Sequence, residues 1–265
     1  MKKVLFSFDI EEFDMPMEYG KDLSLDEQIR ISEEGTKIVL DILRDNKISA
    51  TFFSTVVFAT HAPEMIRRII SEGHELASHG YFHSRFEESH LLDSKVELER
   101  LSGKKVTGFR MARMKSIDDG AVQRAGYVYN SSLNPVYLPG RYNNFFKPRR
   151  VFRSNGLINV PASATPIVRF PLFWLSFHNL PLWIYKLMCS VTMRSDKYLN
   201  IYFHPWEFVD LSPQQFGLPD FASRNSGDKM ARRFASLLTW MKEQGHTFGT
   251  IHDFVADNAY TTKGF

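Results

Sequence analysis

Short apolar segments alternate with amphipathic segments over the first half of this chain, and this alternation is what most constrains its fold. The apolar pattern predicts strands near residues 4–10, 49–55, 74–78, 106–110 and 127–131. Helical periodicity predicts helices near residues 24–46, 63–72, 89–102 and 117–125. Repeated strand–helix units with short connections form a parallel sheet covered by helices, so the sequence predicts an α/β fold.

Boundary signals agree with these helices. Ser24 or Asp26 is expected to cap the first helix, because both residue types accept hydrogen bonds from free backbone N–H groups. Pro63 suits the first turn of the second helix, and Gly73 suits the position just beyond its end.

Three chemically active residues fall at the carboxyl ends of predicted strands. Asp9 ends the first strand, His79 follows the third, and Arg110 ends the fourth. Active sites of parallel barrels and open α/β sheets lie at this edge. We therefore predict that the three side chains share one site.

His79 and His83 stand four residues apart, a spacing that can direct both rings to one metal ion. Gly80 lets the backbone bend as it leaves the strand. Such a pair alone also fits two ordinary histidines beside a turn. The acidic sequence Asp9-Ile-Glu11-Glu12 favours the metal site over two ordinary histidines. Two histidines with one carboxylate form a catalytic metal set with open positions.

The metal carboxylate is not uniquely defined by the sequence. Side chains alternate along a strand, so Asp9 and Glu11 would point to one side and Glu12 to the other. This favours Asp9 and Glu11 as a pair of carboxylates on one side. Glu12 and Asp14 remain alternatives.

The pattern becomes irregular between residues 132 and 199, with many Pro, Asn and aromatic residues. Within it, residues 167–188 are strongly apolar, but Arg169, Pro171 and Lys186 make a membrane span unconvincing. Core packing or a subunit contact is the default interpretation, and a groove for sugar rings or a lipid carrier is the alternative. Further on, the pattern predicts a strand at 200–203, a helix at 228–244 and a strand at 246–251.

Charge and cysteine content exclude several classes of protein. The 33 Lys and Arg against 30 Asp and Glu leave a net charge of +3, too small to indicate a nucleic-acid partner. The one basic cluster, Lys147, Arg149, Arg150 and Arg153, fits a solvated loop or a site for an anionic substrate or membrane surface. A single cysteine, Cys189, rules out an internal disulfide.

The first residues lack the features of a secretory signal. Two lysines precede a brief apolar run that stops at Asp9, short of the usual 7–15 apolar residues and without a small-residue cleavage site. We predict a cytoplasmic protein with residues 1–265 in one catalytic domain, which carries an irregular elaboration at about 132–199.

Four short motifs together resemble the polysaccharide deacetylase family, also called the NodB-homology or carbohydrate esterase family 4 group. They occur in the family's order between residues 6 and 206: Phe6-Ser-Phe-Asp9-Ile-Glu11-Glu12, Ser78-His79-Gly-Tyr-Phe-His83, Gly108-Phe-Arg110 and Tyr202-Phe-His204-Pro-Trp. The resemblance implies a distorted (β/α) barrel, commonly seven-stranded. It also implies a divalent metal, usually zinc, and hydrolysis of an N-acetyl group on a sugar.

The resemblance also implies roles for individual residues. Asp9 matches the general base, and Arg110 matches the arginine that orients it. His204 matches the histidine that protonates the leaving amine. The implied metal ligands are Glu11, His79 and His83.

The sequence departs from the family pattern at three places. Ile10 separates two acidic residues that are usually adjacent aspartates. The segment after Arg110 reads Met-Ala-Arg113 and lacks the usual Pro and aromatic residue, and Arg113 could instead attract a phosphate-bearing or acidic substrate. An Asp-Trp motif to tether His204 is not apparent, and Glu207 is a weak candidate for that role.

These observations predict a metal-dependent amide hydrolase that deacetylates a sugar or glycan intermediate, with a lipid- or nucleotide-linked substrate favoured by the cytoplasmic prediction. A nucleic-acid partner is not expected, whereas peripheral membrane contact is compatible with the sequence. A C–N hydrolase of a small non-sugar amide is an alternative and would need a closed pocket. A non-catalytic, metal-bearing carbohydrate-binding protein is the third interpretation, supported by the altered segment after Arg110.

Overall fold

The predicted alternation of strands and helices is present in the first half of the chain. The computed structural model describes residues 2–259. Its first five strands are β1 (Lys3–Ile10), β2 (Thr51–Ser54), β3 (Glu75–Ser78), β4 (Gly108–Phe109) and β5 (Tyr129–Asn130). The helices between them are α1 (Leu25–Asn46), α2 (Val56–His61), α3 (Pro63–Ser71), α4 (Ser89–Ser102) and α5 (Asp119–Arg124). Ser24 caps α1 by accepting a hydrogen bond from the Glu27 N–H at 3.2 Å.

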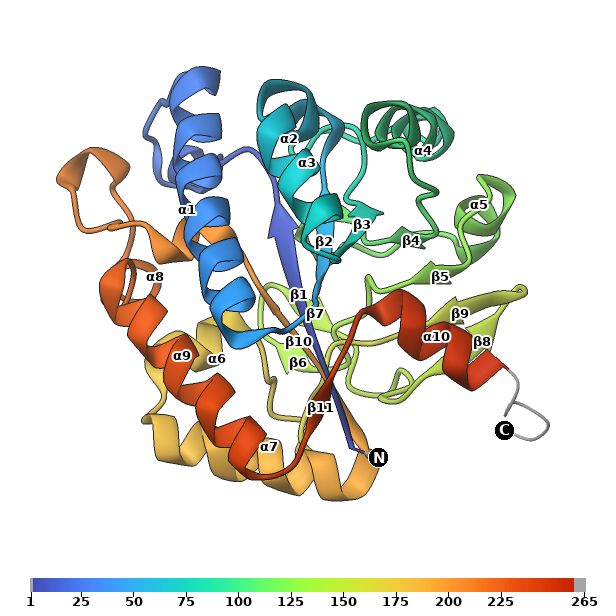
Figure 1. Ribbon diagram of the computed structural model, residues 1–265, viewed down its shortest axis with the longest axis vertical. Helices are drawn as coiled ribbons and strands as arrows, with labels where there is room; N and C mark the ends of the chain where they lie inside the picture. The colour runs from blue at the N-terminus through green and yellow to red at the C-terminus, as the bar shows by residue number, and fades with distance from the viewer. Residues whose placement is uncertain (1, 260–265) are drawn as a thin grey trace.

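The strands form one strongly curved sheet with helices on its outer side (Figure 1). The order is β10–β1–β2–β3–β4–β5–β9–β8, and the strands from β10 to β9 run parallel. The later strands are β8 (Phe152–Ser154), β9 (Leu157–Asn159), β10 (Tyr198–Phe203) and β11 (Thr247–Phe248). The predicted (β/α) barrel class is therefore confirmed. Strand β8 adds an antiparallel edge, and β11 pairs beside the start of β1.

The loop after β9 reaches the far edge of the sheet. Ser163 donates its backbone N–H to the Asn200 carbonyl at 2.8 Å, and its hydroxyl accepts from the Asn200 N–H at 2.9 Å. This pair joins the β9 side of the sheet to β10. It brings the two ends of the curved sheet together around a common interior.

Strand β1 is central because it pairs with both β10 and β2 and is buried from Val4 to Ile10. Phe8 lies opposite Phe203 of β10 and Phe52 of β2 in the strand register. The Phe8 ring lies 5.2 Å from that of Phe52 and 5.9 Å from that of Phe234 on α9 (Asp228–Glu243). Offset and edge-to-face packing of this kind stabilises a core beyond the area it buries.

The apolar segment at 167–188 forms two helices that the sequence pattern did not reveal. They are α6 (Trp174–Asn179) and α7 (Leu182–Asp196). Because α7 has apolar residues on both its buried and exposed sides, no amphipathic period distinguishes it from a continuous apolar run. A small hairpin, β6 (Tyr137–Leu138) and β7 (Tyr142–Asn143), precedes them.

Two other predictions need correction. Helix α2 was not expected, because a six-residue helix is too short to show periodicity; Thr55 starts it by accepting from the Phe58 N–H at 3.1 Å. The predicted strand at 246–251 is only β11, since Thr250 then begins α10 (Ile251–Ala259) by accepting from the Asp253 N–H. Short elements complete the fold: η1 (Met15–Tyr19), η2 (Ala112–Met114), η3 (Pro205–Phe208), η4 (Gln214–Phe216) and α8 (Asp220–Ser223).

Helices in the described part of the chain are all too short or too polar to cross a lipid bilayer.

Candidate metal and catalytic site

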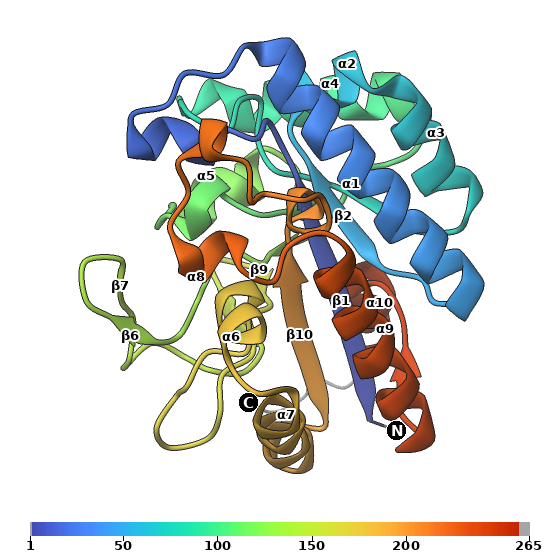
Figure 2. The same cartoon turned by 90° about the vertical axis from the view of Figure 1, so that its left-hand side faces the viewer.

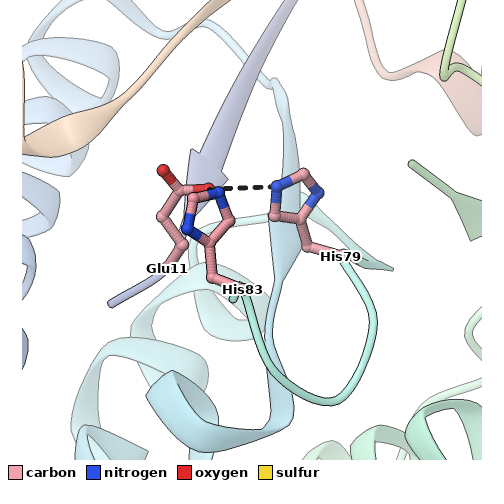
Figure 3. Close-up of side chains that lie close together, drawn as sticks. All are labelled: Glu11, His79 and His83. Atoms are coloured by element: carbon pink, nitrogen blue, oxygen red, sulfur yellow. Dashed lines mark ion pairs between the residues drawn. The ribbon is translucent and has the colours of Figure 1, made fainter. Parts of the chain in front are cut away.

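Glu11, His79 and His83 converge at the carboxyl edge of the sheet (Figure 3). Glu11 follows β1 directly, His79 follows β3, and His83 lies on the loop toward α4. The Glu11 Oε2 atom lies 3.0 Å from His79 Nε2 and 3.1 Å from His83 Nε2. All three residues are buried, and the structure brings these three sequence-predicted ligands together.

The two histidines do not lie on a helix-like turn, contrary to the expectation from their spacing. Residues 79–83 form a loop, and Gly80 has a φ of +89°, which favours glycine. The rings are nevertheless nearly parallel, with centroids 5.8 Å apart and an angle of 19°. The loop backbone, rather than helical periodicity, therefore brings both Nε2 atoms to Glu11.

Hydrogen bonding behind His79 defines its tautomer. Its Nδ1 atom lies 2.9 Å from the Arg110 backbone oxygen, which can only accept, so Nδ1 carries the proton. When His79 is neutral, the lone pair of its Nε2 therefore faces an ionised oxygen of Glu11. Two electron-pair donors at 3.0 Å require a proton or a cation between them. This donor set fits a divalent metal ion.

The pKa shifts of Glu11 and His83 also indicate that the cluster favours a positive charge. Burial raises the pKa of Glu11, but the charge of His83 and the hydrogen bond from His79 lower it well below its usual range. Burial lowers the pKa of His83, but Glu11 and Asp14 raise it to about 9. A bound cation would supply the charge that the proton on His83 otherwise provides.

The two other candidate carboxylates occupy supporting positions. Glu12 lies beside the cluster, where its Oε2 accepts from the Thr55 hydroxyl at 2.6 Å and its Oε1 accepts from the His83 backbone N–H at 3.4 Å. Asp14 lies behind His83, with Oδ1 2.9 Å from Nδ1 of that ring. The structure therefore favours Glu11 as the carboxylate of the cluster.

Asp9 and Arg110 form a buried ion pair beside the cluster. Arg110 Nη1 donates to Asp9 Oδ1 at 2.6 Å, and Nε donates to the Ser131 carbonyl at 3.1 Å. The guanidinium carbon lies 4.1 Å from the centre of the Phe53 ring. With no exposed surface, Arg110 is fixed in orientation and fixes the carboxylate of Asp9 in turn.

His204 is held by Glu207, a partner that sequence reasoning ranked too low. Glu207 is fully buried, and its Oε1 lies 2.9 Å from His204 Nδ1 and accepts from the His204 N–H at 2.6 Å. The sequence could have indicated this contact, because Glu207 lies three residues after His204 and the single turn of η3 brings the two side chains together. His178 of α6 also contacts this carboxylate, with Nε2 3.0 Å from Oε2, but no local pattern links residues 29 positions apart.

This arrangement changes the acidity of the groups involved. Burial lowers the pKa of His204, but the hydrogen bond to Glu207 and the charges of Glu11 and Glu207 raise it above its ordinary value. Burial raises the pKa of Glu207, whereas its bonds to His178 and His204 lower it overall. The His204 ring stacks on Trp206 at 4.6 Å, and its Nε2 lies 4.0 Å from Glu11 Oε1.

The segment after Arg110 forms the short turn η2. Its central residue, Arg113, has a φ of +58°, in the left-handed region. Its Nη2 donates to Asp14 Oδ2 at 2.9 Å, and the guanidinium also pairs with Glu18. The charge of Arg113 is therefore already neutralised within the chain.

These groups surround one pocket with two unlike walls. His79 and Arg110 lie behind it and do not line it. The lining residues are Asp9, Glu11, Asp14, Met15, Glu18, His83, Arg113, Met114, Arg141, Tyr142, Trp174, Tyr202, His204 and Trp206. Acidic groups, an imidazole and aromatic rings thus meet around a single cavity that can admit a substrate.

Comparisons with known proteins agree with this picture. Residues 22–129 match the family model for polysaccharide deacetylase. A chitooligosaccharide deacetylase from Bradyrhizobium sp. (strain ANU 289) is 38% identical over 68 residues, which are 24% of this chain and 31% of that protein. The chain thus spans less than a third of that curated relative's length in the alignment.

Solved structures share the fold across nearly the whole chain. Puue allantoinase aligns with 99% of this chain and 92% of its own, with a TM-score of 0.66 and 15% identity. BA3943, a carbohydrate esterase family 4 pseudoenzyme from Bacillus anthracis, aligns with 95% of this chain and 64% of its own, with a TM-score of 0.54 and 14% identity. The ordered motifs and the matched family model support the polysaccharide deacetylase (NodB-homology) family for this chain, and the solved structures share its fold.

Proposed function

We propose that this chain is a metal-dependent hydrolase that removes an N-acetyl group from a sugar or glycan intermediate. One observation carries the proposal: the Glu11, His79 and His83 cluster shares a pocket with Asp9 and His204. The matched deacetylase family supports the reaction class. The geometry supplies a cation site, a base and a proton donor, which are the three functions that amide hydrolysis requires.

Glu11, His79 and His83 would hold the metal, which we propose to be zinc. Two histidines and one carboxylate leave an open coordination position, as catalytic zinc sites do. When bound there, the ion supplies Lewis-acid chemistry, which polarises the amide carbonyl and lowers the pKa of water. Asp14 behind His83 and the Arg110 carbonyl behind His79 orient the two rings.

Asp9 would act as the general base. It lines the pocket, and its Oδ1 is occupied by Arg110, so its other oxygen remains to accept a proton from the attacking water. Arg110 cannot rotate away, because Ser131 and Phe53 fix its guanidinium. The pair therefore holds the base in a single orientation, which is the main requirement for proton transfer.

His204 would protonate the leaving nitrogen. Its raised pKa favours the imidazolium form, and Nδ1 is engaged by Glu207. Nε2 is then the atom that gives its proton to the amine, which cannot leave as an anion. Trp206 stacks on the imidazole and Trp174 packs edge-on against it at 5.4 Å, so both shield this step from bulk water.

We further propose that the substrate is a lipid- or nucleotide-linked sugar in the cytoplasm. The single cysteine, Cys189, supports this proposal because it fits a reducing compartment. Tyr142 and Trp174 in the pocket lining offer aromatic faces on which a sugar ring can pack.

Metal content and acetate release test the proposal together. Elemental analysis would compare the wild type with Glu11→Ala, Glu12→Ala and the double variant His79→Ala/His83→Ala. We expect about one equivalent of metal in the wild type, retained in Glu12→Ala and lost in the other two. His61→Ala, on the exposed end of α2, is the matched histidine control.

Each protein would then be incubated with N-acetylglucosamine oligomers. Acetate release that disappears with the metal supports the proposal. Bound metal without acetate release from any N-acetylated sugar favours the non-catalytic interpretation, and release from small non-sugar amides alone favours the other hydrolase. Absence of metal from the wild type, or retention after loss of both histidines, contradicts the mechanism.

A further inference from the structure

Helix α7 exposes a continuous apolar stripe. Trp183, Leu187 and Val191 are spaced four residues apart and are 68%, 55% and 42% exposed. The opposite side of the helix is buried through Tyr185 and Cys189. A helix that is apolar on both sides is ordinarily covered on both. Both views place α7 at the lower edge of the molecule with no helix or strand beyond it (Figures 1 and 2).

Two loops that lie against the end of α7 extend this apolar surface. Arg149 ties the first loop to α7 through a bond from Nη2 to Asp196 Oδ1 at 2.7 Å. Arg169 ties the second loop to the first by donating to the Lys147 carbonyl at 2.6 Å. Of the sixteen large apolar side chains exposed among the described residues, these segments carry seven: Phe146, Ile167, Val168, Phe170, Trp183, Leu187 and Val191.

The same segments concentrate positive charge. Residues 145–153, 166–170 and 181–197 contain eight Lys and Arg and one acidic residue, a net charge of 8 − 1 = +7 in a chain of net +3. The acidic residue, Asp196, is paired with Arg149. The other seven have no carboxylate within 4.0 Å in the described part of the chain: Lys147, Arg150, Arg153, Arg169, Lys186, Arg194 and Lys197.

We propose that these three segments, the basic apolar face, bind the surface of an anionic lipid bilayer. An exposed tryptophan beside aliphatic residues is suited to the boundary between headgroups and acyl chains. Lys and Arg around them attract anionic headgroups. Charge complementarity favours this occupant over a second copy of the chain, because two such faces would each carry +7.

The basic apolar face is separate from the pocket. Helix α7 leads into the amino end of β10, whereas His204 follows its carboxyl end. Six residues of extended strand separate them, about 20 Å. A protein held at a bilayer by this face would keep the pocket accessible. The inference does not depend on the proposed function, since no residue of the face lines the pocket.

Cosedimentation with vesicles tests the proposal. Wild-type protein is expected to bind vesicles of phosphatidylcholine mixed with phosphatidylglycerol, to bind weakly to phosphatidylcholine alone, and to dissociate at high salt. Trp183→Ser/Leu187→Ser should weaken binding at least about tenfold. Leu92→Ser/Val96→Ser is the matched control, because these α4 residues have the same spacing and are 54% and 56% exposed. The control should bind like the wild type.

Tryptophan fluorescence supplies a second readout that does not rely on removing the stripe. Trp183 is 68% exposed, whereas Trp174 and Trp206 are 7% and 3% exposed. Emission should shift to shorter wavelength on mixed vesicles, and Trp183→Phe should abolish the shift. Absence of binding by the wild type, or equal loss in both double variants, would overturn the proposal. The proposal would also be overturned if the wild type sedimented as a dimer and the Trp183→Ser/Leu187→Ser variant as a monomer.

Discussion

The two walls of the pocket come from different halves of the chain and handle charge differently. The first wall is built from the strand–helix repeats and is dense in charge: Asp9, Glu11, Asp14, Glu18, His83 and Arg113. The second wall follows the irregular region and is mainly aromatic, with His204 set among Tyr142, Trp174, Tyr202 and Trp206. The first is suited to holding a cation, and the second to keeping one imidazole protonated.

Counter-charges also differ between the walls. Behind the first wall, the buried guanidinium of Arg110 neutralises the carboxylate of Asp9, with one partner for each charge. In the second, a single carboxylate, Glu207, is shared by His178 and His204. Loss of a partner should therefore leave an unpaired charge in the first wall, but a weakened hydrogen-bond network in the second.

The largest effect is expected from Asp9→Asn. This change leaves the buried Arg110 guanidinium without a counter-charge, so we expect the free energy of unfolding to fall by about 3–5 kcal/mol. Urea denaturation would measure it. Asp45→Asn is the control, because Asp45 pairs with Arg44 on the surface and should cost under about 1 kcal/mol. Equal losses of stability at both positions would contradict the expectation that the buried Asp9–Arg110 pair contributes more than a surface pair.

Glu207→Gln should reduce turnover with little loss of substrate binding. A neutral amide cannot balance the imidazolium of His204, and a hydrogen bond to a charged group is worth about 1.5–3 kcal/mol. We expect kcat for acetate release to fall about 10- to 100-fold at nearly constant KM. Glu97→Gln is the control, because Glu97 pairs with Arg100 on α4 and does not line the pocket. A change confined to KM would contradict the positioning role of Glu207.

The difference between the walls also explains what the sequence could predict. Asp9 lies near the end of β1, whereas Glu11, His79 and Arg110 directly follow β1, β3 and β4, and parallel strands end at one edge. Asp9, His79 and Arg110 could therefore be placed together from strand ends alone. Alternation along β1 further separated Glu11 from Glu12, although the strand stops at Ile10.

The second wall could not be predicted in the same way. His178 lies on α6, within an apolar segment whose helices show no clear period, and its contact with Glu207 bridges 29 positions. Tyr142 sits on a two-residue strand of a small hairpin. Such contacts depend on how the irregular region packs against β10, which neither periodicity nor local spacing encodes.

Gly35→Ala tests the contact between α1, which lies in the first half of the chain, and the segment that carries His204. In α1, a methyl group at Gly35 would lie 2.0 Å from the carbonyl oxygen of Pro205, the residue after His204. Ordinary helix propensity favours Ala by about 1 kcal/mol, but this overlap should instead destabilise the protein by about 1–3 kcal/mol. The melting temperature and the rate of acetate release should both decrease. Gly120→Ala in α5 meets only the ends of side chains and is expected to be near neutral.

The smallest effect concerns substrate charge. Arg113 was a candidate for attracting an acidic or phosphate-bearing substrate, but it pairs with Asp14 and Glu18. Arg113→Gln should therefore change the ratio of kcat/KM for anionic over neutral N-acetylated sugars by less than about threefold.

Arg141 is the informative contrast because it belongs to the second wall. Its Nε donates to the Tyr142 hydroxyl at 3.4 Å, and no carboxylate of the described residues lies within 4.0 Å of its guanidinium. An unpaired guanidinium at the pocket can attract an anionic substrate at a distance, whereas a neutralised one cannot. Arg141→Gln should therefore reduce the preference for anionic sugars more than Arg113→Gln does. The reverse order would mean that the carboxylates around Arg113 release it when substrate binds, and that the charged wall rearranges.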